Sequence, residues 1–395
     1  MVQTMQEFRL ESRQWLHDNC PESVRKPGFI PWGSSKIALT EDNSLWLSRM
    51  SEKGWTVPTW PEEYGGGGLG KEDFLILLDE LQRIQARPPL LGMGISMIGP
   101  TLLEFGSEEQ KLRHLPAIVR GDIAWCQGYS EPGSGSDLAS LKLRADADGD
   151  DYIVNGSKIW TTHAHMADHI FCLVRTDNSG RPQQGISFLL IDMDSPGVSV
   201  EPIITMAGDH EVNQVFFENV RVPQANRIGE ENKGWTYAKG LLAHERSGLA
   251  GIQNSVMGLE KAKRNAQKVR VGAGTLLDLS SFKNKVGVLE AELLALEFTE
   301  MRTLARVAAG GDPGPESAIL KLKGTEIQQR ITELNLEAAG VFAAPWGAEA
   351  FGPEFAHGAT QSYLGGRATT IYGGASEVQK DIITKKVLGI KSTKK

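Results

Sequence analysis

The chain of 395 residues has little cysteine, no excess of positive charge and no long apolar run. Its three cysteines, Cys20, Cys126 and Cys172, lack the spacing of a metal site, and they favour a reducing compartment over a disulfide framework. The formal net charge of -7 argues against a nucleic-acid-binding protein and against a basic membrane anchor. No uninterrupted apolar segment reaches the roughly 18–20 residues that span a bilayer. The composition therefore predicts a globular protein with no membrane span and no nucleic-acid partner.

The first 19 residues also lack the apolar core of a secretory signal peptide. They are amphipathic and carry Glu7, Glu11 and Asp18, and such acidic residues are scarce in organelle transit peptides. We therefore expect a cytoplasmic protein.

Signals for phosphate loops and metal sites are equally scarce. The glycine-rich run 60–70 lacks the Lys-Ser/Thr pair of a P-loop and predicts a surface turn. The histidines His163, His165 and His169 lie on or near expected strands and lack a fourth partner. We expect no metal site in this chain.

Hydrophobic periodicity divides the chain into three zones, which we predict to be three domains. Residues 1–121 have helical spacing, residues 122–233 alternate with a period of two, and residues 234–395 return to long helical patterns. This order predicts an α+β protein with an N-terminal helical domain, a middle antiparallel, barrel-like β-domain and a C-terminal helical bundle. We expect strands at 152–154, 170–174, 186–191, 198–200 and 215–217, and helices at 235–268, 276–309, 316–339 and after Gly374.

Two local signals predict how particular elements begin and end. Asn155-Gly156 follows the first strand candidate and is a strong signal for a two-residue hairpin. Ser107, followed by Glu-Glu-Gln110, predicts a helix whose N-cap is the serine.

The most informative stretch is Cys126-Gln-Gly-Tyr-Ser-Glu-Pro-Gly-Ser-Gly-Ser-Asp137, followed by Lys158-Ile-Trp-Thr-Thr162. Small residues, hydroxyls and turn formers let the backbone approach a flat, polar ligand and offer it hydroxyl and N–H donors. Trp160 is either a ring beside that ligand or a buried aromatic residue of a strand.

A second candidate is Glu245, which interrupts an apolar stripe. On one continuous helix, Leu241, Glu245, Leu249, Ile252 and Val256 would share a face. Burial in this stripe would raise the pKa of the carboxyl, which suits a general base that takes a carbon-bound proton. The alternative is a structural glutamate that is paired with an arginine or capped by a neighbour.

Together these motifs resemble those of the acyl-CoA dehydrogenase family. The resemblance rests on segments 126–137, 158–162, 210–217, 231–238 and 368–379. It covers most of the chain beyond residue 50. It is nearest to the large subunit of pimeloyl-CoA dehydrogenase and to subunits of bacterial steroid side-chain acyl-CoA dehydrogenases. It implies the family fold, FAD as cofactor, and oxidation of an acyl-CoA thioester to the trans-2-enoyl-CoA in β-oxidation.

The resemblance also assigns binding residues by position. Ser130 and Thr162 would hydrogen-bond to the isoalloxazine, Tyr129 would contribute backbone contacts, and Trp160 would pack near the ring. Ser136 would lie near the thioester–pantetheine arm. The full set of implied flavin contacts is Gln127, Tyr129, Ser130, Gly135, Ser136, Trp160, Thr161, Thr162, Tyr372, Gly374 and Glu377.

For the catalytic base, the resemblance points to Glu245. The Glu245-Arg246 pair is similar to the base position of isovaleryl-type and long-chain members. In short- and medium-chain members the base follows the tyrosine that matches Tyr372, where this chain has Gly373, which cannot accept a proton. Arg246 would shape the CoA channel or make a buried ion pair, and Gly373 would line the substrate site. Glu377 either caps the last helix or contacts the flavin.

Two departures from the family pattern bear on assembly. Homotetrameric members carry Arg-x-x-Phe-Gly, which reaches a neighbouring subunit's flavin pyrophosphate, whereas region 264–282 has Arg270 but no such motif. They also carry Gln-x-x-Gly-Gly, where this chain has Glu337-Ala-Ala-Gly340. We therefore expect an α2β2 hetero-oligomer in which a second dehydrogenase-like subunit completes the FAD site, with a homotetramer as the alternative.

The sequence does not identify the acyl chain of the substrate, and it constrains the electron acceptor only through the family resemblance. Long aliphatic, dicarboxylic and steroid side-chain thioesters all remain open, because one methylene in a pocket changes the binding free energy by only about 1–3 kcal/mol. The expected acceptor is an electron-transfer flavoprotein. The alternatives to a catalytic dehydrogenase are a non-catalytic subunit with an FAD site and a flavin oxidase or monooxygenase on the same fold.

Overall fold

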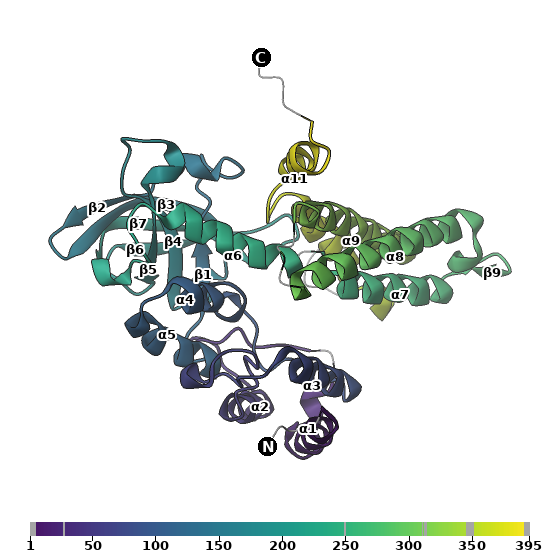
Figure 1. Ribbon diagram of the computed structural model, residues 1–395. Coiled ribbons are helices and arrows are strands. Elements are labelled where there is room, and N and C mark those ends of the chain that lie inside the picture. The colour runs from purple at the N-terminus through teal and green to yellow at the C-terminus, as the bar shows by residue number, and fades with distance from the viewer. Residues whose placement is uncertain are drawn as a thin grey trace. The chain divides into compact units, whose positions relative to one another are not determined.

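A computed structural model describes most of the chain. The described residues are 5–26, 28–248, 250–309, 311, 314–344 and 351–390, with the backbone alone for 242–248 and 308. They form two compact units, and Figure 1 labels most of their elements. Residues 1–203 and 212–241 make up the first unit, and residues 204–211 and 242–395 make up the second.

The first unit begins with a group of helices. These are α1 (Met5–Asn19), α2 (Glu41–Glu52), α3 (Lys71–Arg83), α4 (Gly99–Phe105) and α5 (Glu108–Arg120). Leu16, Trp46, Met50 and Leu77 are buried between α1, α2 and α3 and belong to one apolar core. These helices confirm the helical N-terminal region that the periodicity predicts.

Helix α5 begins with the N-cap that the sequence predicts. Ser107 Oγ accepts a hydrogen bond from the Gln110 N–H at 3.2 Å, and Gln110 Oε1 accepts one from the Ser107 N–H at 3.1 Å. Gln110 Nε2 also donates to the carbonyls of Ala225 and Arg227, which follow the last strand of the sheet. The same side chain therefore caps the helix and ties it to the β-region of this unit.

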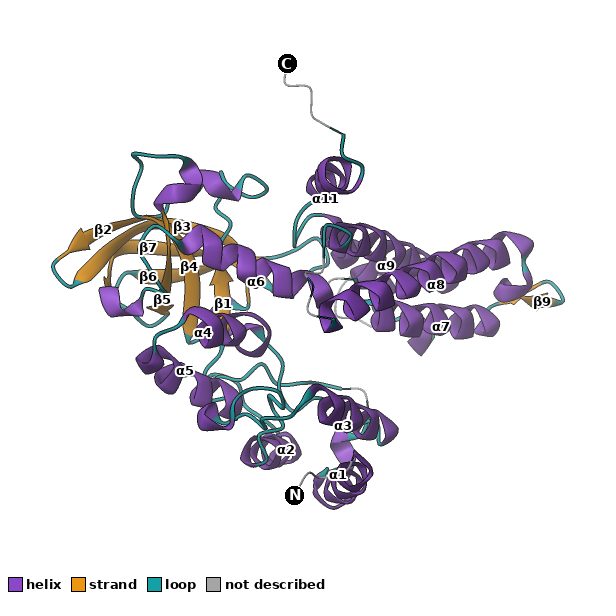
Figure 2. Ribbon diagram, viewed as in Figure 1, coloured by secondary structure: helices purple, strands orange, loops and turns teal. Residues whose placement is uncertain are grey.

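A curled β-sheet follows these helices in the first unit (Figure 2). Its strands are β1 (Trp125–Gly128), β2 (Arg144–Asp148), β3 (Asp151–Thr162), β4 (His169–Arg175), β5 (Ile186–Asp192), β6 (Val198–Ile203) and β7 (Val212–Pro223). The strand order is β1-β4-β2-β3-β7-β6, with β5 paired to β4. Most pairs are antiparallel, but β4 runs parallel to β1 and to β2. Tyr152, Val154, Cys172 and Val215 lie in its core.

The hairpin predicted at Asn155-Gly156 is wrong. Strand β3 continues through both residues, and the turn of this hairpin lies at 149–150, between β2 and β3. The register of β3 against β7 shifts between Val154 and Gly156, so the pair forms a bulge. Gly156 has a φ of 138°, and a Cβ there would lie 2.9 Å from Leu143 Cδ1. The close approach of Leu143 requires a glycine, and this contact is not visible in the local sequence.

The second unit is built on a bundle of long helices. It contains α7 (Ile252–Lys268), β8 (Arg270–Val271), β9 (Gly274–Thr275), α8 (Ser280–Ala308), α9 (Ser317–Ala339), α10 (Ala359–Gly365) and α11 (Ser376–Ile382). Helices α7, α8 and α9 pack against one another around Leu259, Phe282, Leu289 and Ile327. Together with the first unit, this bundle confirms the predicted α+β fold.

The long helix predicted to follow the sheet is two helices. Helix α6 (Gly234–Gly248) ends before Gly251, which has a φ of 54°, and α7 begins directly afterwards. A residue in the left-handed region ends the helical register. Leu241 and Glu245 therefore lie on α6 and Val256 lies on α7, so the single face predicted for them does not form as one helix.

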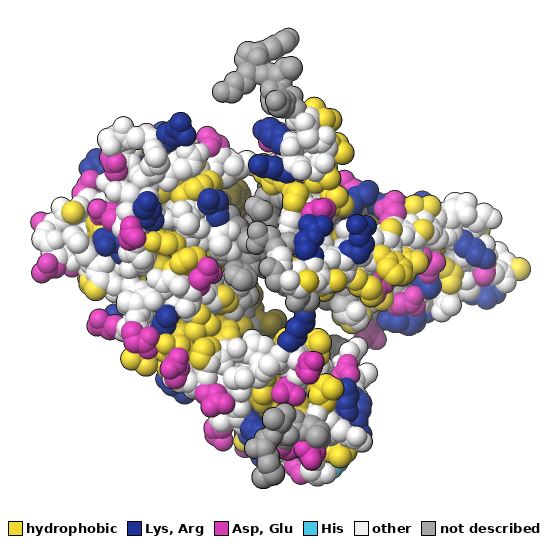
Figure 3. Space-filling view, in the orientation of Figure 1, with side chains coloured by type: hydrophobic (Ala, Val, Ile, Leu, Met, Phe, Trp, Pro, Cys, Tyr) yellow, Lys and Arg dark blue, Asp and Glu magenta, His cyan; other side chains and the backbone are white. Residues whose placement is uncertain are grey.

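Within the described residues, no helix is both long enough and apolar enough to cross a membrane. Acidic and basic side chains are interspersed on the face drawn in Figure 3.

Candidate active site

The predicted binding motif lies where β1 ends beside an irregularity in β3. The Ile159 N–H donates to the Ser130 carbonyl at 2.9 Å and joins the two segments. The pairing of β3 with β7 shifts between Lys158 and Thr161. Trp160, within this shift, has a φ of 60° and is 60% exposed. A non-glycine residue in this region is strained, and here the strained backbone presents the indole to the surface instead of burying it.

Half-buried polar side chains lie on the same two hydrogen-bonded segments as this exposed indole. Ser130 and Thr162 are half-buried, so their hydroxyls are partly accessible to a ligand. Gln127 is half-buried as well, and its Nε2 lies 3.9 Å from Met97 Sδ. These hydroxyl and amide groups can donate or accept hydrogen bonds to a flat, polar ligand.

Thr161 and Tyr129 occupy the same two segments with buried side chains. Thr161 is fully buried, its Oγ1 has no hydrogen-bond partner among the described residues, and its carbonyl accepts from Asn213 Nδ2 at 3.0 Å. The Tyr129 ring is buried edge-on against Phe171 and Phe188. A ligand at the surface would therefore meet these two residues through their backbones.

The loop after β1 is fixed at its base and open at its tip. The N–H groups of Glu131 and Ser134 each donate to the other's carbonyl at 2.9 Å, and Ser134 Oγ donates to the Asp137 carbonyl at 2.8 Å. Gly135 and Ser136, between these anchors, are exposed. Their backbone and the Ser136 hydroxyl are accessible to a ligand.

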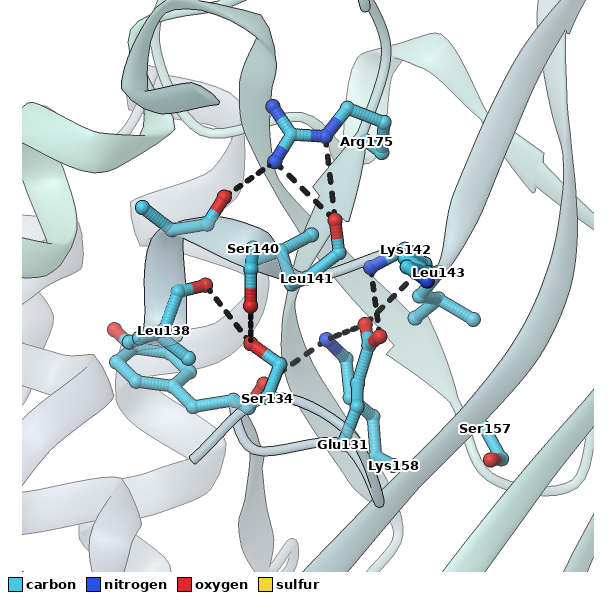
Figure 4. A network of polar contacts seen from close by, with 12 residues as sticks. Glu131, Ser134, Leu138, Ser140, Leu141, Lys142, Leu143, Ser157, Lys158 and Arg175 are labelled. Atoms are coloured by element: carbon cyan, nitrogen blue, oxygen red, sulfur yellow. Dashed lines mark hydrogen bonds and ion pairs between the residues drawn. The ribbon is translucent and has the colours of Figure 1, made fainter. Parts of the chain in front are cut away.

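Sequence reasoning missed a buried ion pair beneath this loop. Lys158 Nζ donates to Glu131 Oε1 at 2.8 Å, and both side chains are buried (Figure 4). Burial lowers the pKa of the Lys158 ammonium, and the charge of Glu131 opposes this effect. A signal was present, because Lys158 has the same strand parity as the buried residues Tyr152 and Val154. A lysine on the inward face of a strand requires a buried partner.

The second unit carries the C-terminal motif. Gly373 and Gly374 have φ values of 60° and 92°, and Gln379 Nε2 donates to the Gly374 carbonyl at 3.3 Å. Desolvation, and then the charge of Glu211, raise the pKa of the Tyr372 phenol. Glu377 lies in the first turn of α11, where a carboxylate favourably meets the positive end of the helix dipole. Tyr372, Gly373 and Gly374 therefore lie in the turn before α11, and Glu377 lies in the first turn of that helix.

Glu245 and Arg246 lie on α6, where the structure describes the backbone alone. Their side chains are outside the described part of the chain, as is Leu249, and the predicted burial of Glu245 stays a prediction.

Models of one protein family match nearly the whole chain. The N-terminal domain of acyl-CoA dehydrogenase matches residues 11–122, its middle domain residues 126–220, and its C-terminal domain residues 232–388.

Individual proteins match over almost their full length as well. The acyl-CoA dehydrogenase IpdE1 of Mycobacterium tuberculosis is 33% identical over 398 residues, which cover 98% of each chain. The solved Tcur3481-Tcur3483 steroid ACAD has a TM-score of 0.79 and 30% identity, again over 98% of each chain. The ChsE4-ChsE5 complex from Mycobacterium tuberculosis has a TM-score of 0.77 and 30% identity over 98% of each chain. These matches confirm the resemblance that the motifs indicate.

Proposed function

This chain belongs to the acyl-CoA dehydrogenase family of oxidoreductases that act on CH–CH bonds, and we propose that it catalyses the FAD-dependent α,β-dehydrogenation of an acyl-CoA thioester. The product would be the trans-2-enoyl-CoA. Because the similar solved Tcur3481-Tcur3483 protein is described as a steroid ACAD, we favour a steroid side-chain thioester over the aliphatic and dicarboxylic alternatives.

The observation that carries this proposal is the surface formed by the end of β1 and the irregularity in β3. It combines the exposed Trp160 indole, the half-buried hydroxyls of Ser130 and Thr162, and the open Gly135-Ser136 tip. An aromatic face beside hydroxyl and backbone donors fits an isoalloxazine, which is flat and has polar edges. The residues present therefore fit FAD, with Gln127, Tyr129 and Thr161 completing the contacts through side chain or backbone.

The proposed catalytic residue is Glu245. The site needs a base that removes the acidified Cα proton, and bound FAD supplies the acceptor for the Cβ hydride. Gly373, with no side chain, leaves the position after Tyr372 without a base. Arg246 would shape the CoA channel or make a buried ion pair, and Ser136 would lie near the thioester–pantetheine arm. Tyr372, Gly374 and Glu377 would contact the flavin, and Gly373 would line the substrate site.

We further propose that the active enzyme is a hetero-oligomer. The ChsE4-ChsE5 structure is a complex of two differently named proteins, and the chain is 30% identical to the aligned subunit. Arg270, in the region where homotetrameric members carry their flavin-reaching motif, donates to the carbonyl of Ala273 in its own β8–β9 hairpin. A second dehydrogenase-like subunit would then complete the FAD site. An electron-transfer flavoprotein would accept the electrons, and the free cysteines fit a cytoplasmic setting.

The test is anaerobic bleaching of the flavin absorbance by a panel of acyl-CoA thioesters. The protein is produced together with any adjacent dehydrogenase-like subunit. We expect the wild type to bleach with one class of thioester, and Glu245→Gln to bind flavin but not to bleach. Loss of the base should lower the bleaching rate by at least about 100-fold.

The control is Glu260→Gln, an exposed carboxylate of α7 that pairs with Lys263, and this variant should bleach like the wild type. Equal bleaching by the wild type and Glu245→Gln would show that another residue is the base. A wild type that binds flavin and bleaches with no thioester would favour the non-catalytic subunit. Fast reaction of the reduced flavin with oxygen would favour an oxidase or monooxygenase.

A further inference from the structure

We propose that Lys158 is a positioning residue for the flavin site, acting through Glu131 and the carbonyl of Tyr129. This inference rests on the proposed function only for the identity of the ligand. Lys158 precedes Trp160 and Thr162 by two and four residues, and its ammonium contacts the segment that carries Ser130. A buried charge therefore links the two stretches of backbone that form the candidate site.

The contacts of the ammonium are aimed at the loop after β1. Lys158 Nζ donates to the Tyr129 carbonyl at 3.0 Å and to Glu131 Oε1 at 2.8 Å. These partners lie on either side of Ser130, whose own carbonyl accepts from the Ile159 N–H. One backbone hydrogen bond, from Ile159 to Ser130, therefore joins the two segments. Two bonds from the Lys158 ammonium join them at the residues before and after Ser130. Together these bonds set the distance between Ser130 and the Trp160 backbone.

Glu131 extends this link beyond the loop. Its Oε2 accepts from the Lys142 N–H at 2.6 Å, and its Oε1 accepts from the Leu143 N–H at 2.9 Å. Residues 131–143 form a loop that contains Gly135 and Ser136. The Glu131 carboxylate, at the start of this loop, binds the N–H groups at its end and so closes it. Figure 4 shows the carboxylate between the Lys158 ammonium and these two N–H groups.

Arg175 of β4 binds the second half of the same loop. Its Nη2 donates to the Ala139 carbonyl at 2.6 Å and to the Leu141 carbonyl at 3.2 Å, and its Nε donates to Leu141 at 3.3 Å. These partners are backbone carbonyls, like the Tyr129 carbonyl that Lys158 binds. The loop is therefore fixed by side chains of the sheet at successive points, while its tip stays open to the ligand.

Stability alone is a poor reason for this arrangement. Desolvating two opposite charges costs as much as their attraction returns, so apolar residues of similar volume often stabilise a protein equally well. What an apolar pair cannot do is bind the Tyr129 carbonyl and the N–H groups of Lys142 and Leu143 at fixed places. The geometry points to placement of the loop, and through it of Ser130, as the role of the pair.

The experiment separates placement from stability with two variants. Lys158→Met leaves the carboxylate buried without its cation, and Lys158→Met/Glu131→Gln removes both charges while keeping an acceptor for the loop N–H groups. The protein, co-produced with its partner subunit, is stripped of flavin and titrated with FAD. The measurements are the dissociation constant, the visible circular dichroism of bound FAD and the melting temperature of the flavin-free protein.

We expect Lys158→Met to lower the melting temperature and the double variant to recover most of it. The double variant should still bind FAD at least about tenfold more weakly and show an altered circular dichroism band, because the link to the Tyr129 carbonyl stays broken. Glu80→Gln is the matched control. It breaks a buried ion cluster between α1 and α3, and it should lower the melting temperature without changing FAD affinity.

Wild-type affinity and circular dichroism in the double variant would overturn the positioning role. The positioning role would also be overturned if Glu80→Gln, at a similar loss of melting temperature, lost as much FAD affinity as the double variant. The weaker binding would then be a consequence of lower stability. Failure of the proposed function looks different. In that case the wild type still binds FAD and the variants still weaken it, but no acyl-CoA thioester bleaches the flavin.

Discussion

Glu80 of α3 is a fully buried carboxylate that contacts the side chains of Arg9, Arg13 and Arg83. The bonds from Arg13 reach 2.9 and 3.0 Å, and the bond from Arg83 is 2.7 Å. The hydrogen bond from Arg13 is the main cause that lowers the pKa of Glu80 to about 2, against the opposing effect of its burial. Because Arg9 and Arg13 belong to α1, this residue fastens the first helix to the third.

We predict that Glu80→Gln lowers the free energy of unfolding by about 3 kcal/mol near neutral pH, because a carboxyl shifted from its ordinary value of 4.5 to about 2 favours the folded state by that amount. A depressed pKa stabilises the fold above pH 4.5, and this contribution is lost as the pH falls from about 4.5 towards 2. Denaturant unfolding of the wild type and the variant as a function of pH measures it.

The two curves should converge at the acid end, where the wild-type carboxyl is protonated as well. Equal stability of the two proteins at pH 7 would contradict the prediction, and so would a difference that persists unchanged below pH 3. Asp79→Asn is a suitable control, since Asp79 bonds to Arg9 but is exposed, and exposed pairs contribute little.

At the scale of elements, glycines lie where a helix ends or a strand forms a bulge that the local sequence pattern does not predict. Gly251 separates α6 from α7, and a Cβ there would lie 2.4 Å from Gln328 Nε2. That amide of α9 donates to the Ala250 carbonyl at 3.2 Å, so the break between the helices is held by a contact with a distant element. The local helical pattern cannot reveal this.

We predict that Gly251→Ala lowers the free energy of unfolding by about 1–2 kcal/mol, because an L-residue is strained in the left-handed region and its Cβ displaces Gln328. Gly287→Ala is the matched control. Gly287 is exposed inside α8, a Cβ there would meet no atom within 4 Å, and alanine should stabilise this helix by up to about 1 kcal/mol. Thermal unfolding compares them, and a stabilising Gly251→Ala would show that the helix break is dispensable.

At the scale of the molecule, the long helix α8 presents an exposed apolar face. Leu294, Phe298 and Met301 follow one another at steps of four and three, and each is more than half exposed. A contiguous apolar face on a helix is typical of a surface that another protein covers. It supports an oligomer, which would be the proposed hetero-oligomer or its alternative, the homotetramer.

We predict that the chain produced alone retains little FAD, and that co-production with a second dehydrogenase-like subunit yields a flavin-containing α2β2 complex. Light scattering and the ratio of flavin to protein absorbance measure both properties. A flavin-saturated, active homotetramer of this chain alone would rule the hetero-oligomer out.

The face of α8 can be tested in the same complex. We expect Phe298→Glu to weaken assembly by at least about tenfold in dissociation constant, because it places a charge in an apolar interface. The control Leu112→Glu, on an equally exposed leucine of α5, should assemble normally. Unchanged assembly of Phe298→Glu would assign this face of α8 no part in the interface.

The sequence by itself determined the family, the order of helical, β and helical regions, the N-cap at Ser107 and the segments that form the candidate site. Each of these depends on residues close together in the chain, where periodicity, turn chemistry and motif spacing act. Tertiary structure alone decided the bulge at Asn155-Gly156, the break at Gly251, the exposure of Trp160 and the pairing of Lys158 with Glu131. These depend on contacts with Leu143, Gln328, the strand β7 and the loop after β1, and such contacts exist only after distant parts of the chain have packed.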